Sequence, residues 1–200
     1  MLRRRLSPDE SRAAAMDAAH ELLIEQGVAA ITLKSVAERI GRTHANLLHH
    51  FGSVAGLHRA LAEEIARRVA DSILSAIGRR RRGEASPRDV VDAMFDSFER
   101  EKVGELVGWI ALTRQREALA PITRTIAAIL EDFRVEAIPV RMDHVVHGLV
   151  LLAIGDSLVG PEVAAATGGD RQAVRDIAVI QIAALLGRPI PPPPALSPLL

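Results

Sequence analysis

The chain has 200 residues, and its 25 Lys and Arg are balanced by 25 Asp and Glu. A chain of this length buries about 70% of its unfolded surface on folding, so it can form a hydrophobic core without crosslinks. Because it contains no cysteine, disulfides, thiolate metal sites and cysteine nucleophiles are excluded.

The charge is unevenly distributed along the chain. Residues 1–82 carry 14 basic and 9 acidic side chains, whereas residues 83–200 carry 11 and 16. Such an asymmetry between halves favours contact of the first half with a polyanion.

Nothing in the sequence predicts export or a membrane span. The basic start at Arg3, Arg4 and Arg5 is followed by polar residues where a signal peptide has an apolar run. The most apolar stretch, 145–158, contains Asp156 and is shorter than the roughly 20 residues that a span needs. We expect a soluble, cytoplasmic protein with no membrane partner.

Apolar residues recur at helical spacing almost throughout, which predicts an all-α chain. In the first half, a capping box at Ser7 opens a helix over 8–26 that Gly27 ends. A short helix begins at Thr32, another occupies about 42–51, and a long one runs to about residue 77. Two short helices joined at Gly41 are typical of a helix-turn-helix.

The second half predicts a loop over 79–86 and then five further helices. Their expected ranges are about 87–102, 104–117, 119–137, 142–166 and 171–186, with breaks near Pro139 and Gly168-Gly169. The Gly160-Pro161 pair is expected to kink or split the fourth of them. The proline-rich tail is expected to be extended or disordered.

Small and apolar residues occur over positions 12–65 in a characteristic order. They are Ala19, Leu22, Leu23, Gly27, Thr32, Val36, Ala37, Ile40, Gly41, Leu47, His50, Phe51 and Leu57. This order resembles the DNA-binding domain of the TetR family of bacterial transcriptional regulators. The resemblance implies a helix-turn-helix domain with a basic arm over 1–52, a helical effector-binding and dimerisation domain over 53–188, and a tail over 189–200.

The expected DNA contacts lie on the second and third helices. They are Thr32, Lys34, Arg42, Thr43, His44, Asn46, Leu48 and His49. Asn pairs with adenine, Arg with guanine or phosphate, and Thr and His with either base edges or phosphate. By the resemblance, Thr32 and Lys34 contact the backbone, while helical spacing places Leu47, Leu48 and Phe51 together on the inner side.

Two residues depart from the family pattern. Leu48 stands where a tyrosine is usual, and Val54 stands where a lysine usually opens the fourth helix. The main interpretation is a ligand-responsive regulator, usually a repressor, that binds palindromic operator DNA. The alternative is a small-molecule sensor or protein-interaction module with a degenerate DNA-binding head.

The second half is expected to hold an effector of unknown identity. The candidate ligand-binding residues are Phe95, Phe98, Trp109, Arg114, Phe133, Met142 and His144. No cofactor is predicted.

The two last helices are apolar on more than one face, which predicts a partner. Gly148 and Gly155 lie seven residues apart, on nearly the same face, and would allow close approach of a second helix. The resemblance implies a homodimer closed by a four-helix bundle.

Three patterns suggest other chemistry and are set aside. Gly155-Asp156-Ser157-Leu158 matches a hydrolase signature, but no histidine base follows His147, so we expect no enzyme activity. Asp143, His144 and His147 provide too few assigned ligands for a metal site. The arginines of 79–82 are expected to form a solvated loop.

Overall fold

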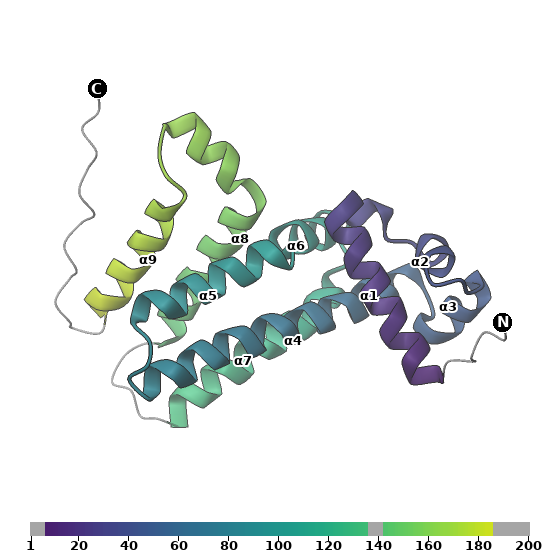
Figure 1. The fold of residues 1–200 in the computed structure, drawn as a ribbon, viewed down its shortest axis with the longest axis horizontal. Helices are drawn as coiled ribbons and strands as arrows, with labels where there is room; N and C mark the ends of the chain where they lie inside the picture. Colours follow the sequence, from purple (N-terminus) through teal and green to yellow (C-terminus); the bar gives the residue numbers. More distant parts are fainter. Residues whose placement is uncertain (1–6, 136–141, 186–200) are drawn as a thin grey trace.

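The computed structural model describes residues 7–135 and 142–185, which form helices and no strand (Figure 1). The elements are α1 (Pro8–Gln26), η1 (Val28–Ala30), α2 (Leu33–Arg39), α3 (His44–Phe51), α4 (Val54–Arg81), α5 (Pro87–Arg100), α6 (Val103–Leu112), η2 (Arg116–Leu119), α7 (Ala120–Val135), α8 (Met142–Thr167) and α9 (Gln172–Leu185). The predicted all-α fold is confirmed. The basic arm at 3–5, Pro139 and the tail at 189–200 lie outside the described residues.

The first three helices form a head at one end of an elongated molecule, and α4 leads from this head into the body (Figure 1). The head closes around a buried cluster of side chains from all four helices. Its members include Ala19, Leu22, Leu23, Val36, Ala37, Leu47, Phe51, Leu57 and Leu61. These are largely the residues that carry the resemblance, so the pattern in the sequence is mainly a packing pattern.

Helix α4 is longer than the sequence predicted. Arg79, Arg80 and Arg81 belong to its last turn, so the loop expected over 79–86 is confined to the residues after Arg81. Cationic side chains at a helix C-terminus interact favourably with the partial negative charge there, which offsets their mutual repulsion.

The helix expected over 104–117 ends early. Helix α6 stops at Leu112, and Arg114 adopts a left-handed conformation with φ 60° before the short η2. No glycine or proline marks this end, so the local sequence did not predict it.

Helix α8 continues through Pro161, and its ribbon changes direction in the second half (Figure 1). The expected kink is therefore present without a split. By length and composition alone this helix could cross a membrane, and 11% of its most apolar window is buried within the chain. It nevertheless packs against α5, α6 and α9.

Arginines of α9 attach this last helix to α5 and α8. Arg175 is buried and lies 2.7 Å from Asp96. Arg171 lies 2.8 Å from the buried Asp156 and 2.7 Å from Glu99. The hydrogen bonds that Arg171 donates to Asp156 and then to Glu99 raise the pKa of Arg171, so its guanidinium stays charged at every physiological pH.

Candidate nucleic-acid interface and ligand cavity

Each of the two helices of the helix-turn-helix, α2 and α3, begins at a threonine that caps it. Thr32 Oγ1 accepts a hydrogen bond from the Ser35 amide at 3.0 Å and caps α2. Thr43 Oγ1 accepts one from the Asn46 amide at 3.2 Å and caps α3. Both threonines are exposed. The predicted roles of these residues as caps are confirmed, and their roles as DNA contacts remain predictions.

The outer face of α3 presents His44, Leu48 and His49 to solvent, whereas Leu47 and Phe51 are buried. Leu48 is 43% exposed, so the expectation that it packs inward with Leu47 is wrong. Successive residues of a helix are about 100° apart, and the buried face of this short helix is too narrow to include Leu47 and Leu48 together. Leu48 therefore lies on the face that a DNA groove would meet.

Asn46 and Arg42 are half-buried at the edge of this face. The Asn46 Oδ1 atom is buried and has no hydrogen-bond partner. A bidentate contact with adenine needs this oxygen, so the side chain must rotate outward on binding. Pairing with a base would then satisfy a buried acceptor.

Lys34 lies on the exposed side of α2, with its side chain 78% exposed. Its Nζ is 3.9 Å from Glu38, also well exposed, so the pair adds little to stability. Arg39 is held instead by Glu21 and Glu25 of α1, and the hydrogen bond from Arg39 lowers the pKa of Glu25. Lys34 is thus available for phosphate, whereas Arg39 fixes α2 to α1.

Arg12 is a candidate that the sequence reasoning missed. It is exposed on α1, and its guanidinium carbon lies 5.0 Å from the centre of the Phe51 ring. A guanidinium within about 6 Å of a ring centre is attracted electrostatically by the face of the ring. This places a positive charge beside the C-terminal end of α3, which the position of Arg12 in the first helix did not indicate.

The head is connected to the body by two contacts from the α5–α6 corner. Glu105 Oε1 accepts a hydrogen bond from the Val28 amide at 3.0 Å. His20 Nε2 lies 2.9 Å from the buried Glu101, although the two atoms do not align as a hydrogen bond. Gly27 has a φ of 81°, and a Cβ there would lie 2.7 Å from Glu105. Glu105 of α6 therefore contacts the segment between α1 and α2 directly.

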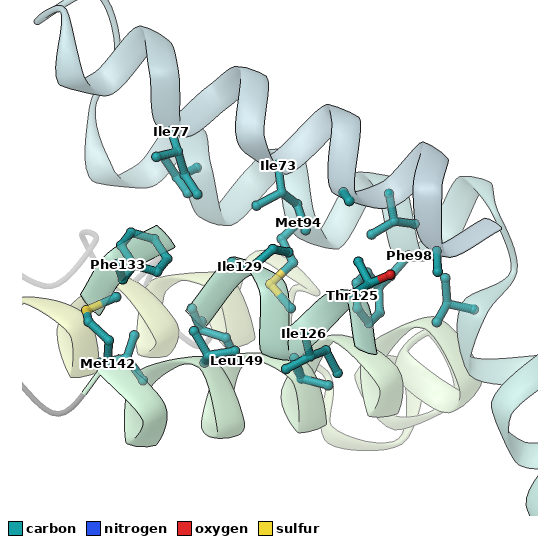
Figure 2. Close-up of a pocket in the computed structure, with 18 of the residues that line it drawn as sticks. Ile73, Ile77, Met94, Phe98, Thr125, Ile126, Ile129, Phe133, Met142 and Leu149 are labelled. Atoms are coloured by element: carbon teal, nitrogen blue, oxygen red, sulfur yellow. The ribbon is translucent and has the colours of Figure 1, made fainter. Parts of the chain in front are cut away.

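The body contains an apolar cavity of about 210 Å³ lined mainly by α4, α5, α7 and α8 (Figure 2). Among the expected ligand-binding residues, Phe98, Phe133 and Met142 lie on its wall. The other four lie elsewhere. Phe95 is buried in the core beneath Arg175, and His144 lines a second, more open hollow between α8 and α9.

Trp109 and Arg114 also do not reach the cavity. Arg114 is exposed just after α6, and Trp109 is half-buried on it. The charged residues that do line the cavity are Arg80 and Arg81, which the sequence assigned to a loop. They reach the wall because α4 extends to Arg81, which the sequence did not predict.

The hydrolase-like motif has a structural role. Ser157 lies within α8, and its Oγ accepts a hydrogen bond from the Gly104 amide at 2.9 Å. A Cβ at Gly104 would collide with this hydroxyl and with α8 backbone. Ser157 and Gly104 therefore hold α6 close to α8, and Asp156 is occupied by Arg171.

A metal site at the start of α8 finds no support. Asp143 and His144 lie 3.9 Å apart on the exposed side of the helix. Over 7–135 and 142–185, no group of three or more acidic or histidine side chains could hold a metal ion.

Comparison with known proteins gives matches at two levels. Residues 15–61 match the model of the bacterial regulatory proteins of the tetR family. The whole fold is similar to the crystal structure of a protein from Rhodococcus sp. assigned to the TetR-family transcriptional regulators. That match has a TM-score of 0.63 and 18% sequence identity, and it covers 89% of this chain and 99% of the other. No curated protein sequence matches the chain.

Proposed function

We propose that this chain, whose residues 15–61 match the tetR family model and whose fold is similar to that of a TetR-family protein, is a ligand-responsive repressor of that family that binds a palindromic operator as a homodimer. The observation that carries the proposal is the outer face of α3, the second helix of the helix-turn-helix, which presents polar side chains to solvent. A helix of this kind fits the major groove.

We assign the contacts by their positions. Thr32, Lys34 and Thr43 stand at helix starts or on the exposed side of α2 and contact phosphates, which positions the head. His44, Asn46 and His49 lie along α3 and contact base edges, which specifies sequence. Arg12, beside Phe51, adds a phosphate contact at the other end of α3.

Dimerisation is supported by apolar residues of α8 and α9 that this chain alone leaves exposed. They are Leu151, Leu158, Val159, Val163, Ile177 and Leu185. A Cβ added at Gly148 or Gly155 would meet no atom within 4 Å, so both glycines leave space for a second helix. A two-fold pair is the simplest arrangement that covers such a surface.

This arrangement also explains the apolar character of α8 without a membrane. The helix carries the buried Asp156, and its inner side packs on α6. We propose that its exposed side packs on the partner, and that the protein acts in the cytoplasm on chromosomal DNA.

The effector site in this proposal is the cavity beneath α4. Helix α4 joins the head to the body, and the cavity lies against its second half. A ligand that changes the position of α4 or α6 would change the separation of the two heads in a dimer. In this proposal the protein is a regulator that carries no catalysis of its own.

The alternative is a sensor whose head no longer binds DNA. Leu48 and Val54 favour it, because both are exposed apolar residues where a tyrosine and a lysine are usual. Neither of these apolar side chains can bind a phosphate. Neither of them would prevent α3 from entering the DNA groove. The remaining polar residues of α3 are sufficient for specific contacts, and we therefore rank this alternative second.

Selection of bound duplexes from a random pool tests the proposal. We expect an enriched, two-fold symmetric sequence whose affinity falls steeply as salt rises, because bound phosphates release counterions. The variant His49→Ala serves as a comparison. We expect it to keep the fold and to bind the selected duplex more weakly. Failure of the full-length protein to enrich any sequence would support the sensor interpretation instead.

A further inference from the structure

The cavity extends along the second half of α4. Along α4 its wall includes residues from Ile65 to Arg81, and because a helix rises about 1.5 Å per residue this lining extends over about 24 Å. Figure 2 shows Phe133 and Met142 at one end, Ile129 and Leu149 midway, and Phe98 toward the other end. A compact ligand would leave much of this length empty.

The wall has almost no hydrogen-bonding capacity along its length. Thr125 is the polar side chain midway, and its hydroxyl already donates to the Pro121 carbonyl at 3.0 Å. No acidic, histidine or amide side chain lies among the described residues of the wall. A ligand with many polar groups would therefore lose its hydrogen bonds to water without replacement.

Charge is confined to one end. Arg80 and Arg81 belong to the last turn of α4, and the Arg81 guanidinium carbon lies 6.0 Å from the centre of the Phe133 ring. Phe133 lines the cavity beside it. The site thus combines an extended apolar channel with a cationic end, which is complementary to an extended apolar chain that ends in an anion.

We propose that the cavity binds a long unbranched fatty acid, with its carboxylate at Arg80 and Arg81 and its chain directed along α4 toward Phe98. The proposal names the class of effector and rests on the proposed function only for the consequence of binding. An extended chain advances about 1.2 Å per bond, as in an extended peptide, so a chain of roughly 14–18 carbons spans about 16–20 Å and fits within the length lined by α4.

Chain length and head group give separate tests in the full-length protein without DNA. Palmitate, laurate and 1-hexadecanol are titrated below their aggregation limits and followed by calorimetry, with native mass spectrometry for stoichiometry. We expect one palmitate per chain. Each buried methylene contributes about 3- to 4-fold in affinity, so palmitate should bind at least tenfold more tightly than laurate. Absence of palmitate binding, or equal binding of laurate, overturns the proposal.

Variants of the last turn of α4 test the cationic end. The double variant Arg80→Gln/Arg81→Gln should weaken palmitate about tenfold and leave the neutral 1-hexadecanol within twofold. Arg79→Gln is the matched control, because Arg79 belongs to the same turn but is not part of the cavity wall. Circular dichroism verifies that each variant folds. Equal loss in Arg79→Gln would overturn the assignment, since it would show an effect of general charge.

The source of the acyl chain is decided by a third titration. Palmitoyl-coenzyme A carries the same chain but has a bulky thioester head in place of the carboxylate. We expect weaker binding of this thioester than of palmitate, and tighter binding would overturn the choice of the free acid. Because these measurements need no DNA, a protein that binds palmitate and selects no operator contradicts only the proposed function, and the reverse result contradicts only this inference.

Discussion

Asn46 is the residue whose local environment most clearly favours contact with a base. Its buried, unpaired Oδ1 gains a partner if the side chain rotates onto adenine. Lys34, by contrast, is exposed on α2 and faces no base edge in the proposed orientation. The two residues should therefore respond differently to substitution.

Asn46→Ala should relax the preference at one base position, at a cost of about 1–3 kcal/mol for the preferred base. Lys34→Ala should weaken all sequences alike and reduce the salt dependence. Binding to a panel of operators with single base changes measures both effects. If each variant lost the same affinity on every member of the panel, this division of roles would be wrong.

Ser157 is the residue at which a structural role and a catalytic one make opposite predictions. Ser157→Ala removes the acceptor of the Gly104 amide and should destabilise the fold by about 1–3 kcal/mol. Urea unfolding measures this change, with Ser75→Ala on the exposed side of α4 as control. Esterase activity in the native protein that is lost in Ser157→Ala would instead identify a nucleophile.

At the scale of elements, the contact between Glu105 and the Val28 amide connects α6 to the head. In Glu105→Ala the Val28 amide loses its acceptor, so its hydrogen exchange should accelerate at least tenfold. The amides of α4 beside the cavity should remain unchanged. Glu117→Ala, an exposed glutamate of η2, is the control. Unaltered exchange at Val28 would show that this connection does not stabilise the head.

The helices of the head could be predicted from the sequence because each has a local signal. Ser7, Thr32 and Thr43 cap their helices as the sequence indicated. The end of α4 could not be predicted from the sequence. A run of arginines is compatible both with a solvated loop and with the last turn of a helix, and the sequence alone does not distinguish the two. The residues of the cavity wall could not be predicted either. Phe95 and Phe98 both belong to α5, and the sequence does not indicate which side of this helix faces the cavity.

The proposed binding to a palindromic operator requires a second copy of the chain. Ile177 of α9 is 50% exposed and belongs to the apolar surface assigned to the partner. Ile177→Glu should yield monomers by sedimentation and abolish specific DNA binding, while the helical content is retained. Ile24→Glu is matched in type and exposure, at 48% on α1, and should leave the dimer intact. A wild-type monomer at micromolar concentration would contradict the proposed interface.

The most direct test of a dimeric, sequence-specific regulator is the affinity for a selected operator compared with that for the same duplex with one half-site scrambled. Two recognition helices one helical turn apart, about 34–36 Å, must both be engaged for full specificity. We predict two chains bound per intact operator and a loss of at least about 100-fold when one half-site is scrambled, within the range that separates specific from non-specific binding. Equal affinity for the two duplexes, with a single chain bound to each, would contradict the account.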